Sequence, residues 1–483
     1  MKKNKLLKRT VFSLVILIIA IIGFFSLTPY IFRLNPPKVD MSQVPFNRGV
    51  TVIDSVGAFF EKSYLKQNEW GLWEVYLEGK PFERGLATGK LERKLLEYQE
   101  DAFVKEIRHL VPSDFYLKSL RNFISIFNRN LNRVISDEFR EEIYGISLSC
   151  SSKYNNFGTP YERQLNYHAA HDLGHAMQDY MLVGCTSFAL WDADSEDSSL
   201  IVGRNFDFYV GDDFAKNKTV LFCAPDTGYR FVSIAWAGMC GVVSGMNERG
   251  LTVTINAAKS AMPLSSATPV SILCREILQY ASTIEEALRI AEKCKLFVSE
   301  SILIGSAADH SAAIIEKSPN RQGFFTAKGN HIVCANHFQS ETFAEDAENK
   351  ENTDNADSYY RQARMEELIA ENIPINPLKA AQILRNRDGI NNQPLELGDE
   401  RAINQLIGHH SVIFKPEQRQ IWVSTSPWQL GVYVCYDLDS VFAKPTIFHT
   451  NCDRELNIPA DSFIMSPEFA KFLYKRDLKE QSR

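Results

Sequence analysis

The strongest pattern in the chain is an uninterrupted apolar segment near the amino terminus. From Thr10 to Phe32 there is no charged residue, and isoleucine and leucine dominate. A helix of this length crosses a hydrocarbon core of roughly 30 Å. Lysines and an arginine precede it, so the positive-inside rule keeps the amino terminus cytoplasmic and sends the rest of the chain across the membrane. We therefore predict a basic tip and membrane anchor over residues 1–33; a cleaved signal peptide is the alternative, although no small-x-small cleavage site follows.

The pattern behind the anchor divides the chain into three further regions. Residues 34–49 hold three prolines and few large apolar side chains, which predicts an extended linker. Residues 50–184 show apolar positions at helical spacing and are predicted to form a mainly helical segment. Residues 185–483 begin with short alternating runs and are predicted to form a separate, larger domain.

Strand and helix patterns alternate along this larger domain. Helices are predicted between Val270 and Lys293 and around Arg361, whereas the acidic, asparagine-rich stretch 346–357 is predicted to be an exposed loop. Strands are predicted over residues 185–191, 200–209, 219–223, 231–236, 241–244, 251–255, 301–307, 312–316, 411–414 and 420–424. This order of strands, helices and strands indicates sheet layers covered by helices, which is an α+β fold.

Composition excludes some classes of protein and leaves others open. The 483 residues are 45% apolar and 23% charged, the balance of a globular protein with a large core. A formal net charge of -6 gives no basic excess for phosphate contacts, so nucleic acid is excluded as a partner. The nine cysteines are an odd number without a Cys-x-x-Cys pair or zinc-ligand spacing. In an exported chain the unpaired cysteine raises the question of which thiol is reactive, although most lone cysteines are buried small hydrophobes.

Gly184 and Cys185 form a candidate self-cleavage site. The cysteine starts a predicted strand directly after the residue that adopts strained backbone geometry at least cost. Attack of the thiol on the Gly184 carbonyl would give a thioester, and hydrolysis would leave Cys185 with a free α-amino group. That amine has a reference pKa of about 7.7 to 8.0 and can act as the base of the thiol.

The residues after this pair resemble a known family. The segments 203–208, 245–251 and 334–338 read Gly-Arg-Asn-Phe-Asp-Phe, Gly-Met-Asn-Glu-Arg-Gly-Leu and Cys-Ala-Asn-His-Phe. In this order they resemble the linear-amide hydrolases, which include choloylglycine hydrolases, the isopenicillin N/6-aminopenicillanic acid acyltransferases and acid ceramidase. The resemblance spans residues 79–434. It implies the four-layer αββα sandwich of the amino-terminal-nucleophile hydrolases, and residues 50–184 would be a small subunit or propeptide before the catalytic domain.

The resemblance also implies a role for each matched residue. Cys185 matches the nucleophile, Arg204 the arginine that polarises it, and Asp207 the aspartate that holds the new α-amino group. Asn256 matches the asparagine that stabilises the tetrahedral oxyanion, and Asn336 matches a second asparagine of the pocket. The last matched position is Arg361, a helical arginine that braces the site, although Arg364 lies close enough to blur this assignment. Taken singly, these could be turn residues or members of ordinary ion pairs.

Two other classes of protein remain open. His168, His171 and His175 follow the spacing of one helix face beside Asp172, which would suit a zinc-dependent hydrolase. Gly174 weakens such a helix, and the aspartate replaces the glutamate that zincin chemistry uses. A catalytically inactive, membrane-tethered binding protein is the other alternative.

The function implied by the resemblance is cleavage or transfer at linear, non-peptide amide bonds through a thioester acyl-enzyme. An acid-ceramidase-like lipid amidase is an alternative within the same superfamily. No metal or organic cofactor is expected. Acyl-coenzyme A would become a donor if the reaction is acyl transfer, and the two fragments are expected to remain associated after cleavage.

Overall fold

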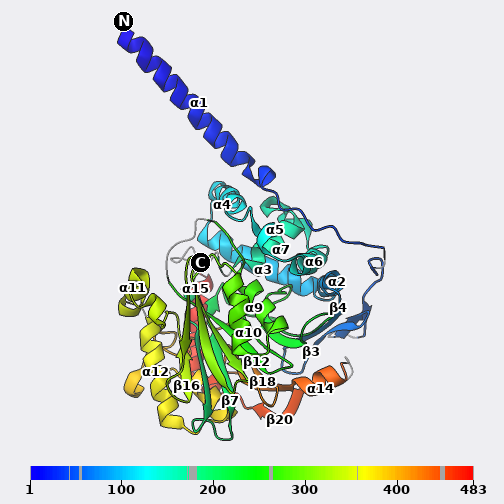
Figure 1. Ribbon diagram of the computed structural model, residues 1–483, viewed down its shortest axis with the longest axis vertical. Helices are drawn as coiled ribbons and strands as arrows, with labels where there is room; N and C mark the ends of the chain where they lie inside the picture. Colours follow the sequence, from blue (N-terminus) through cyan, green and yellow to red (C-terminus); the bar gives the residue numbers. More distant parts are fainter. Residues whose placement is uncertain are drawn as a thin grey trace.

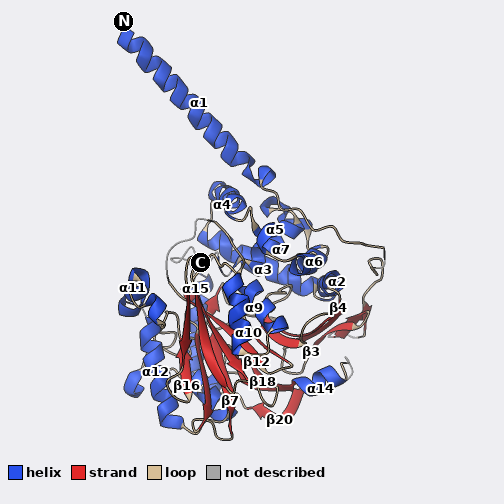
Figure 2. Cartoon of the chain, viewed as in Figure 1, coloured by secondary structure: helices blue, strands red, loops and turns tan. Residues whose placement is uncertain are grey.

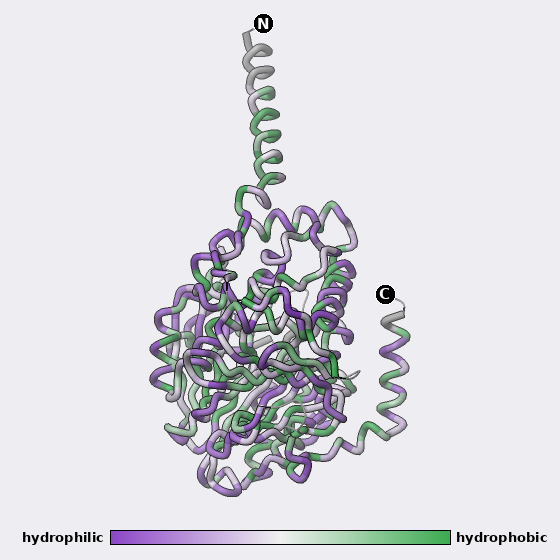
Figure 3. Tube along the Cα trace, turned by 90° about the vertical axis from the view of Figure 1, so that its right-hand side faces the viewer, coloured by the Kyte–Doolittle hydropathy of each residue, from purple (hydrophilic) through white to green (hydrophobic). Residues whose placement is uncertain are grey.

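A computed structural model describes residues 2–42, 44–53, 57–170, 172, 182–259, 265–355, 357–445 and 452–481. The amino-terminal helix α1 (Lys2–Ile31) extends away from the folded body (Figure 1). Within it, Thr10–Ile31 is long and apolar enough to cross a membrane, and most of its side chains are exposed, whereas Thr28 near its end is buried. Figure 3 shows this hydrophobic stretch standing clear of the body.

The larger of two sheets has eleven strands and takes its first four from the segment before Cys185. They are β1 (Thr51–Val52), β2 (Gly57–Phe60), β3 (Ser63–Gln67), β4 (Trp73–Gly79), β9 (Thr219–Pro225), β10 (Phe231–Ala235), β11 (Ser244–Asn247), β12 (Leu251–Ala257), β13 (Glu300–Ser306), β14 (Ser311–Lys317) and β15 (Gln322–Thr326), in this spatial order. Neighbours are antiparallel except for β4 and β9, which pair in parallel. The segments before and after Cys185 are therefore joined in one sheet.

The smaller sheet has seven strands and carries the residues that follow Cys185. They are, in spatial order, β16 (His331–Cys334), β6 (Thr186–Asp192), β7 (Ser198–Phe206), β17 (His410–Lys415), β18 (Gln420–Ser424), β19 (Tyr433–Asp437) and β20 (Cys452–Ile458). A separate two-stranded pair consists of β5 (Leu182–Val183) and β8 (Phe208–Tyr209).

The helices surround the two sheets (Figure 2). They are α2 (Pro81–Leu91), α3 (Arg93–Leu110), α4 (Asp114–Phe127), α5 (Leu131–Val134), α6 (Asp137–Ser147), α7 (Pro160–His168), α9 (Val270–Tyr280), α10 (Ile284–Lys293), α11 (Ala347–Asn355), α12 (Asp357–Asn372), α13 (Pro377–Leu384), α14 (Leu438–Ala443) and α15 (Pro467–Gln481). Short 3-10 helices are η1 (Ser152–Phe157), η2 (Glu341–Phe343), η3 (Ile390–Asn392) and η4 (Ser462–Met465).

Three apolar cores show how the layers stack. Between the sheets, side chains of the larger sheet such as Val232 pack with those of the smaller sheet such as Val412. On the outer face of the larger sheet, a second core joins β12 to α9 and to the helices of residues 81–168. On the outer face of the smaller sheet, Ile413 packs with Leu368 of α12 and Ile383 of α13. The mixed, layered fold expected from the sequence is confirmed, with helices, two sheets and helices in succession.

The structure also corrects several local predictions. The strands between Thr51 and Gly79 were not predicted, although β3 and β4 have buried side chains, because their apolar residues lack strict alternation. The stretch 346–357 was predicted to be a loop, and this was wrong, since α11 occupies most of it. Its start is stabilised by Asp346, whose side chain accepts a 3.0 Å hydrogen bond from the backbone of Asn349. Strand β11 begins at Ser244, where the predicted strand ends.

Candidate active site

Two strand pairings place Gly184 and Cys185 beside Asp207. Val183 pairs with Phe208, and Thr186 pairs with Asn205, so the two residues between them face the end of β7. The backbone N–H of Gly184 donates a 3.0 Å hydrogen bond to the carbonyl of Asp207. The Cys185 thiol lies 3.9 Å from the same carbonyl oxygen and is fully buried. Local β-pairing therefore fixes the bond predicted to be cleaved.

Arg204 lies on β7 with its guanidinium against Cys185. The Nη2 atom is 3.8 Å from the Cys185 sulfur, while Nη1 donates a 2.8 Å hydrogen bond to the carbonyl of Val243. Further bonds to the Ser244 hydroxyl and the Ile255 carbonyl fix the group in place. Burial raises the pKa of the Cys185 thiol to about 11, and the charge of Arg204 opposes this effect. The arginine is thus placed to stabilise a thiolate.

The side chain of Asp207 is fully buried, which is unusual for a carboxyl group without hydrogen-bond partners. Neither of its carboxylate oxygens has a hydrogen-bond partner among the residues that the structure describes. Burial raises the pKa of this carboxyl to about 7, while the charges of Arg361 and Arg204 act to lower it. An unsatisfied buried carboxyl is costly, so Asp207 is a candidate functional group rather than an ordinary structural one.

The two asparagines lie on neighbouring elements of the same site. Asn256 on β12 donates a 3.0 Å hydrogen bond to the carbonyl of Cys334 and accepts a 3.0 Å bond from the Ser187 hydroxyl. Asn336 follows β16 and donates a 2.9 Å bond to the carbonyl of Ala257. These bonds fix the orientation of each amide plane, because a side-chain amide donates only from nitrogen and accepts only at oxygen.

Arg361 on α12 joins the site, and Arg364 does not. The Nη2 atom of Arg361 donates a 2.7 Å hydrogen bond to Asn336 Oδ1, and its charge acts on Asp207. Arg364 instead forms an ion pair of 2.6 Å with Glu367. The structure thus places all six predicted catalytic residues in buried positions, and it separates Arg361 from its neighbour. Five of the six are linked by hydrogen bonds or by charge, whereas Asn256 bonds Ser187 and the Cys334 carbonyl.

A family model matches this part of the chain. Residues 193–426 match the family described as acyl-coenzyme A:6-aminopenicillanic acid acyl-transferase. The predicted resemblance to this family is therefore confirmed over these residues. The matched residues include Arg204, Asp207, Asn256, Asn336 and Arg361, but the match begins after Cys185.

More distant similarities extend over about half of the chain. An uncharacterized protein of Archaeoglobus fulgidus is 25% identical over 276 residues, which cover 54% of this chain and 46% of the relative. The N-acylethanolamine-hydrolyzing acid amidase of Caenorhabditis elegans is 21% identical over 265 residues, covering 51% of this chain and 67% of the amidase. A solved structure of a mutant conjugated bile acid hydrolase from Clostridium perfringens shares 13% identity, covers 53% of this chain and 93% of that chain, and has a TM-score of 0.36. The chain spans about half the length of relatives such as the archaeal protein.

Sequence reasoning missed two buried residues at the site. Gln405 donates a 2.9 Å hydrogen bond from Nε2 to the carbonyl oxygen of Gly184. Glu300, at the start of β13, is fully buried, and its charge acts to raise the pKa of the Cys185 thiol. Neither residue belongs to a recognisable motif. Gln405 lies 221 positions after Gly184, a separation at which no local periodicity operates.

The predicted histidine constellation is only partly described. His168 is buried at the end of α7; its Nδ1 atom lies 2.7 Å from the carbonyl of Gln164, and its Nε2 atom accepts a 3.0 Å bond from the backbone of Cys240. Both ring nitrogens are therefore occupied, and burial lowers the pKa of this imidazole to about 4. His171 and His175 lie outside the described residues. Where the chain is described, no group of three or more potential ligands could hold a metal ion.

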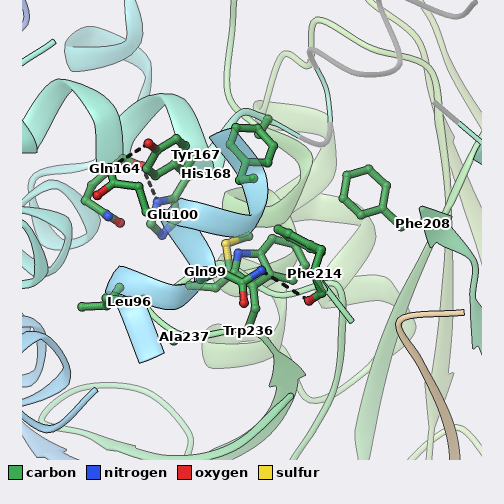
Figure 4. Close-up of a pocket in the computed structure, with 14 residues that line it drawn as sticks. Leu96, Gln99, Glu100, Gln164, Tyr167, His168, Phe208, Phe214, Trp236 and Ala237 are labelled. Carbon is green, nitrogen blue, oxygen red and sulfur yellow. Dashed lines mark hydrogen bonds between the residues drawn. The ribbon is translucent and has the colours of Figure 1, made fainter. Parts of the chain in front are cut away.

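Two adjoining cavities lie close to the site. The smaller, of about 40 Å³, is lined by Trp236 and by Phe208, which follows Asp207 directly (Figure 4). The larger, of about 450 Å³, lies between α3, α4 and α7. Both cavities are lined by Phe103, Tyr167 and Ala170. The two cavities therefore adjoin, and the smaller one reaches Phe208, the residue after Asp207.

Proposed function

We propose that the protein is an amidohydrolase or acyltransferase that acts on linear amide bonds and activates itself by cleavage between Gly184 and Cys185. The observation that carries this proposal is the buried Asp207 carboxyl, which has no hydrogen-bond partner among the described residues and whose charge acts on the Cys185 thiol. Cleavage would create an α-ammonium group on Cys185, close to this carboxyl across the paired strands. The new ammonium would supply the donor that the carboxyl lacks.

The proposed reaction uses the new amino group as a base. In its neutral form the α-amino group takes the proton of the Cys185 thiol, and Arg204, 3.8 Å from the sulfur, stabilises the thiolate. The thiolate attacks the amide carbonyl of the substrate and releases an amine, which leaves an acyl group on sulfur as a thioester. Water or an acceptor amine then removes the acyl group. An acyl-coenzyme A would enter the same site as an alternative acyl donor.

The two asparagines support the charged intermediate of this reaction. The amide of each is held by a backbone carbonyl, Asn256 by that of Cys334 and Asn336 by that of Ala257. Donors fixed before the reaction are effective at an oxyanion because they need no reorganisation. Arg361 in turn holds the oxygen of Asn336 and so fixes the direction of its nitrogen.

The two fragments would remain associated after cleavage. Strand β4 of the first fragment pairs along seven positions with β9 of the second. Helices α2 and α6 also contribute to the same apolar core as α9 and β12. Breaking one backbone bond leaves these contacts in place, so a stable two-chain enzyme is expected.

A lipid amide is the second candidate substrate, and the larger cavity favours it. Its volume of about 450 Å³ lies within the range of roughly 300–1,000 Å³ for small-molecule sites. It is lined mostly by apolar side chains, including Leu117 and Ile124 of α4. The end of α1 also contacts α4, since the Thr28 hydroxyl donates a 3.2 Å bond to the carbonyl of Asn122. If α1 anchors the protein, with the catalytic part on the extracytoplasmic side, this cavity lies beside the membrane.

The lipid-amide candidate is tested by filling the cavity. We expect Ile124→Trp to raise KM for a fluorogenic amide with a long acyl chain by roughly 10-fold or more, while the short-chain analogue is unaffected. Lys118→Trp is the control, because Lys118 is exposed on the same helix and does not line the cavity. Equal effects of Ile124→Trp on both substrates would contradict an acyl-chain site.

Intact-mass measurement of the purified protein tests self-cleavage. The wild type should give two fragments, the second beginning at Cys185, whereas Cys185→Ala should remain one chain and lose all amidase activity. Cys274→Ala is a matched control, because Cys274 is an equally buried cysteine on α9. A single wild-type chain that hydrolyses amides would overturn the proposal.

A further inference from the structure

The carbonyl of Gly184 is the electrophile of the proposed self-cleavage, and Gln405 contacts its oxygen. The Nε2 atom of Gln405 donates a 2.9 Å hydrogen bond to this oxygen, and the side chain is 2% exposed. We propose that Gln405 is a catalytic residue of self-cleavage, where its amide stabilises the negative charge that forms on the Gly184 oxygen. This inference rests on the proposed function and assigns one of its steps to a residue outside the family motifs.

The glycine at position 184 is explained by the same contact. A Cβ atom at this position would lie 2.1 Å from Gln405 Nε2 and 2.5 Å from Oε1. The backbone of Gly184 is not left-handed, so the reason for glycine here is not a special φ. A Cβ at this position would displace the Gln405 amide from the scissile carbonyl. With its N–H bonded to Asp207 and its C=O bonded to Gln405, the peptide unit is held on both sides.

The turn that carries Gln405 is itself held in a costly conformation. Leu406, the next residue, has a φ of 55°, which L-residues other than glycine, asparagine and aspartate adopt rarely. Asn404 supports it, because its Oδ1 atom accepts a 3.0 Å bond from the Leu406 backbone. Strained backbone of this kind persists where the surroundings impose it and is common at functional sites. Here the strain presents the Gln405 amide to the scissile bond.

The proposed step conserves atoms and charge. The Cys185 sulfur forms a bond to the Gly184 carbonyl carbon, and the π electrons move to the oxygen, where Gln405 donates its hydrogen bond. The intermediate collapses by breaking the bond to the Cys185 nitrogen, which takes up the proton lost by the thiol. Water then attacks the resulting thioester through a second intermediate with the same oxygen. This leaves a Gly184 carboxylate, a free thiol and an α-ammonium group, because the amine takes up the proton that the new carboxyl loses.

A time course of cleavage after cell-free synthesis of the full chain tests the proposal. We expect Gln405→Ala to slow cleavage by roughly 10²- to 10³-fold, the typical cost of removing one oxyanion donor. Gln279→Ala is the control for loss of a buried glutamine amide: Gln279 lies on α9, donates to Glu138 and the Thr227 carbonyl, and has no contact with Gly184. Thermal unfolding of both variants separates lost stability from lost catalysis.

Two further variants give readouts that a structural role would not change. Gln405→Glu should cleave slowly at neutral pH and faster as the pH falls, because only a protonated carboxyl can donate to the oxyanion. Gly184→Ala should slow cleavage in the wild type by displacing the amide, and should add little in a Gln405→Ala background. Independent, multiplicative effects of the two substitutions would overturn the proposed contact.

The outcomes distinguish this inference from the function on which it rests. If the wild type is never cleaved before Cys185, self-activation itself fails. If the wild type is cleaved and Gln405→Ala is cleaved at the same rate, self-activation stands and the role of Gln405 is overturned.

Discussion

The Cys185 site and the His168 region are both buried and polar, and they differ in how their polar groups are satisfied. Both nitrogens of His168 have backbone partners, and the side chain of Asp172 accepts a 2.8 Å bond from the backbone of Val270. Asp207, in contrast, has two buried oxygens without a partner in the described structure. The hydrogen-bonded side chains of His168 and Asp172 hold their helices in place. The Asp207 carboxyl, which lacks such partners, is the group that the proposed reaction uses.

Replacing each aspartate by asparagine should give the largest contrast between the two regions. Asp207→Asn removes the negative charge that would bind the new α-ammonium, so kcat/KM should fall by roughly 10³-fold or more, a loss comparable to that of other groups that orient a catalytic base. Asp172→Asn should retain activity, because the amide has the same shape and its oxygen can still accept the bond from the Val270 backbone. Burial raises the pKa of Asp172 and so already disfavours the charge that this substitution removes. Steady-state kinetics on purified variants measures both, and equal losses would remove the distinction.

Reagents that inactivate either a cysteine thiol or a metal site test the same difference between the two regions. Iodoacetamide should abolish amidase activity of the cleaved protein by modifying Cys185, since the thiolate beside Arg204 is the proposed nucleophile. Prolonged treatment with EDTA should leave the rate unchanged. Activity that is lost to the chelator and restored by zinc would instead favour a metal site that includes His171 and His175.

The two neighbouring arginines of α12 offer a smaller test. Arg361→Lys removes the hydrogen bond to Asn336 and replaces the delocalised guanidinium charge near Asp207 by a point charge. Because the asparagine then loses its orientation, kcat should fall by roughly 10- to 100-fold. Arg364→Lys alters only the contacts with Glu367 and the nearby asparagines. Its kcat should remain within roughly twofold of the wild type, as expected for a residue outside the site.

The last prediction concerns the stability of the fold rather than activity, and the group responsible is His168. Its folded pKa of about 4 lies below the ordinary value of 6.5, so the unfolded chain gains a proton first as the pH falls. Stability is therefore lost between pH 6.5 and pH 4, by up to about 3 kcal/mol. The free energy of unfolding of His168→Gln should fall less steeply over this interval in denaturant titrations. An unchanged slope would show that His168 is not the group responsible.

Much of the architecture could be predicted from the sequence because it depends on local periodicity. The apolar run that forms α1, most central strands and the Val270–Lys293 helices were recognised in this way. The strands before Gly79 and the helix α11 were not. Their positions depend on pairing with β9 and on a capped helix start, which composition does not reveal.

The sequence alone singled out the residues proposed to carry chemistry, since the order of Cys185, Arg204, Asp207 and Asn256 resembles that of the family. Only the tertiary structure decided between Arg361 and Arg364, because both lie on one helix, about one turn apart, and only their contacts separate a site residue from an ion pair with Glu367. The tertiary structure also brought Gln405 to Gly184 across 221 positions. Sheet packing sets such long-range contacts, and local sequence patterns carry no information about them.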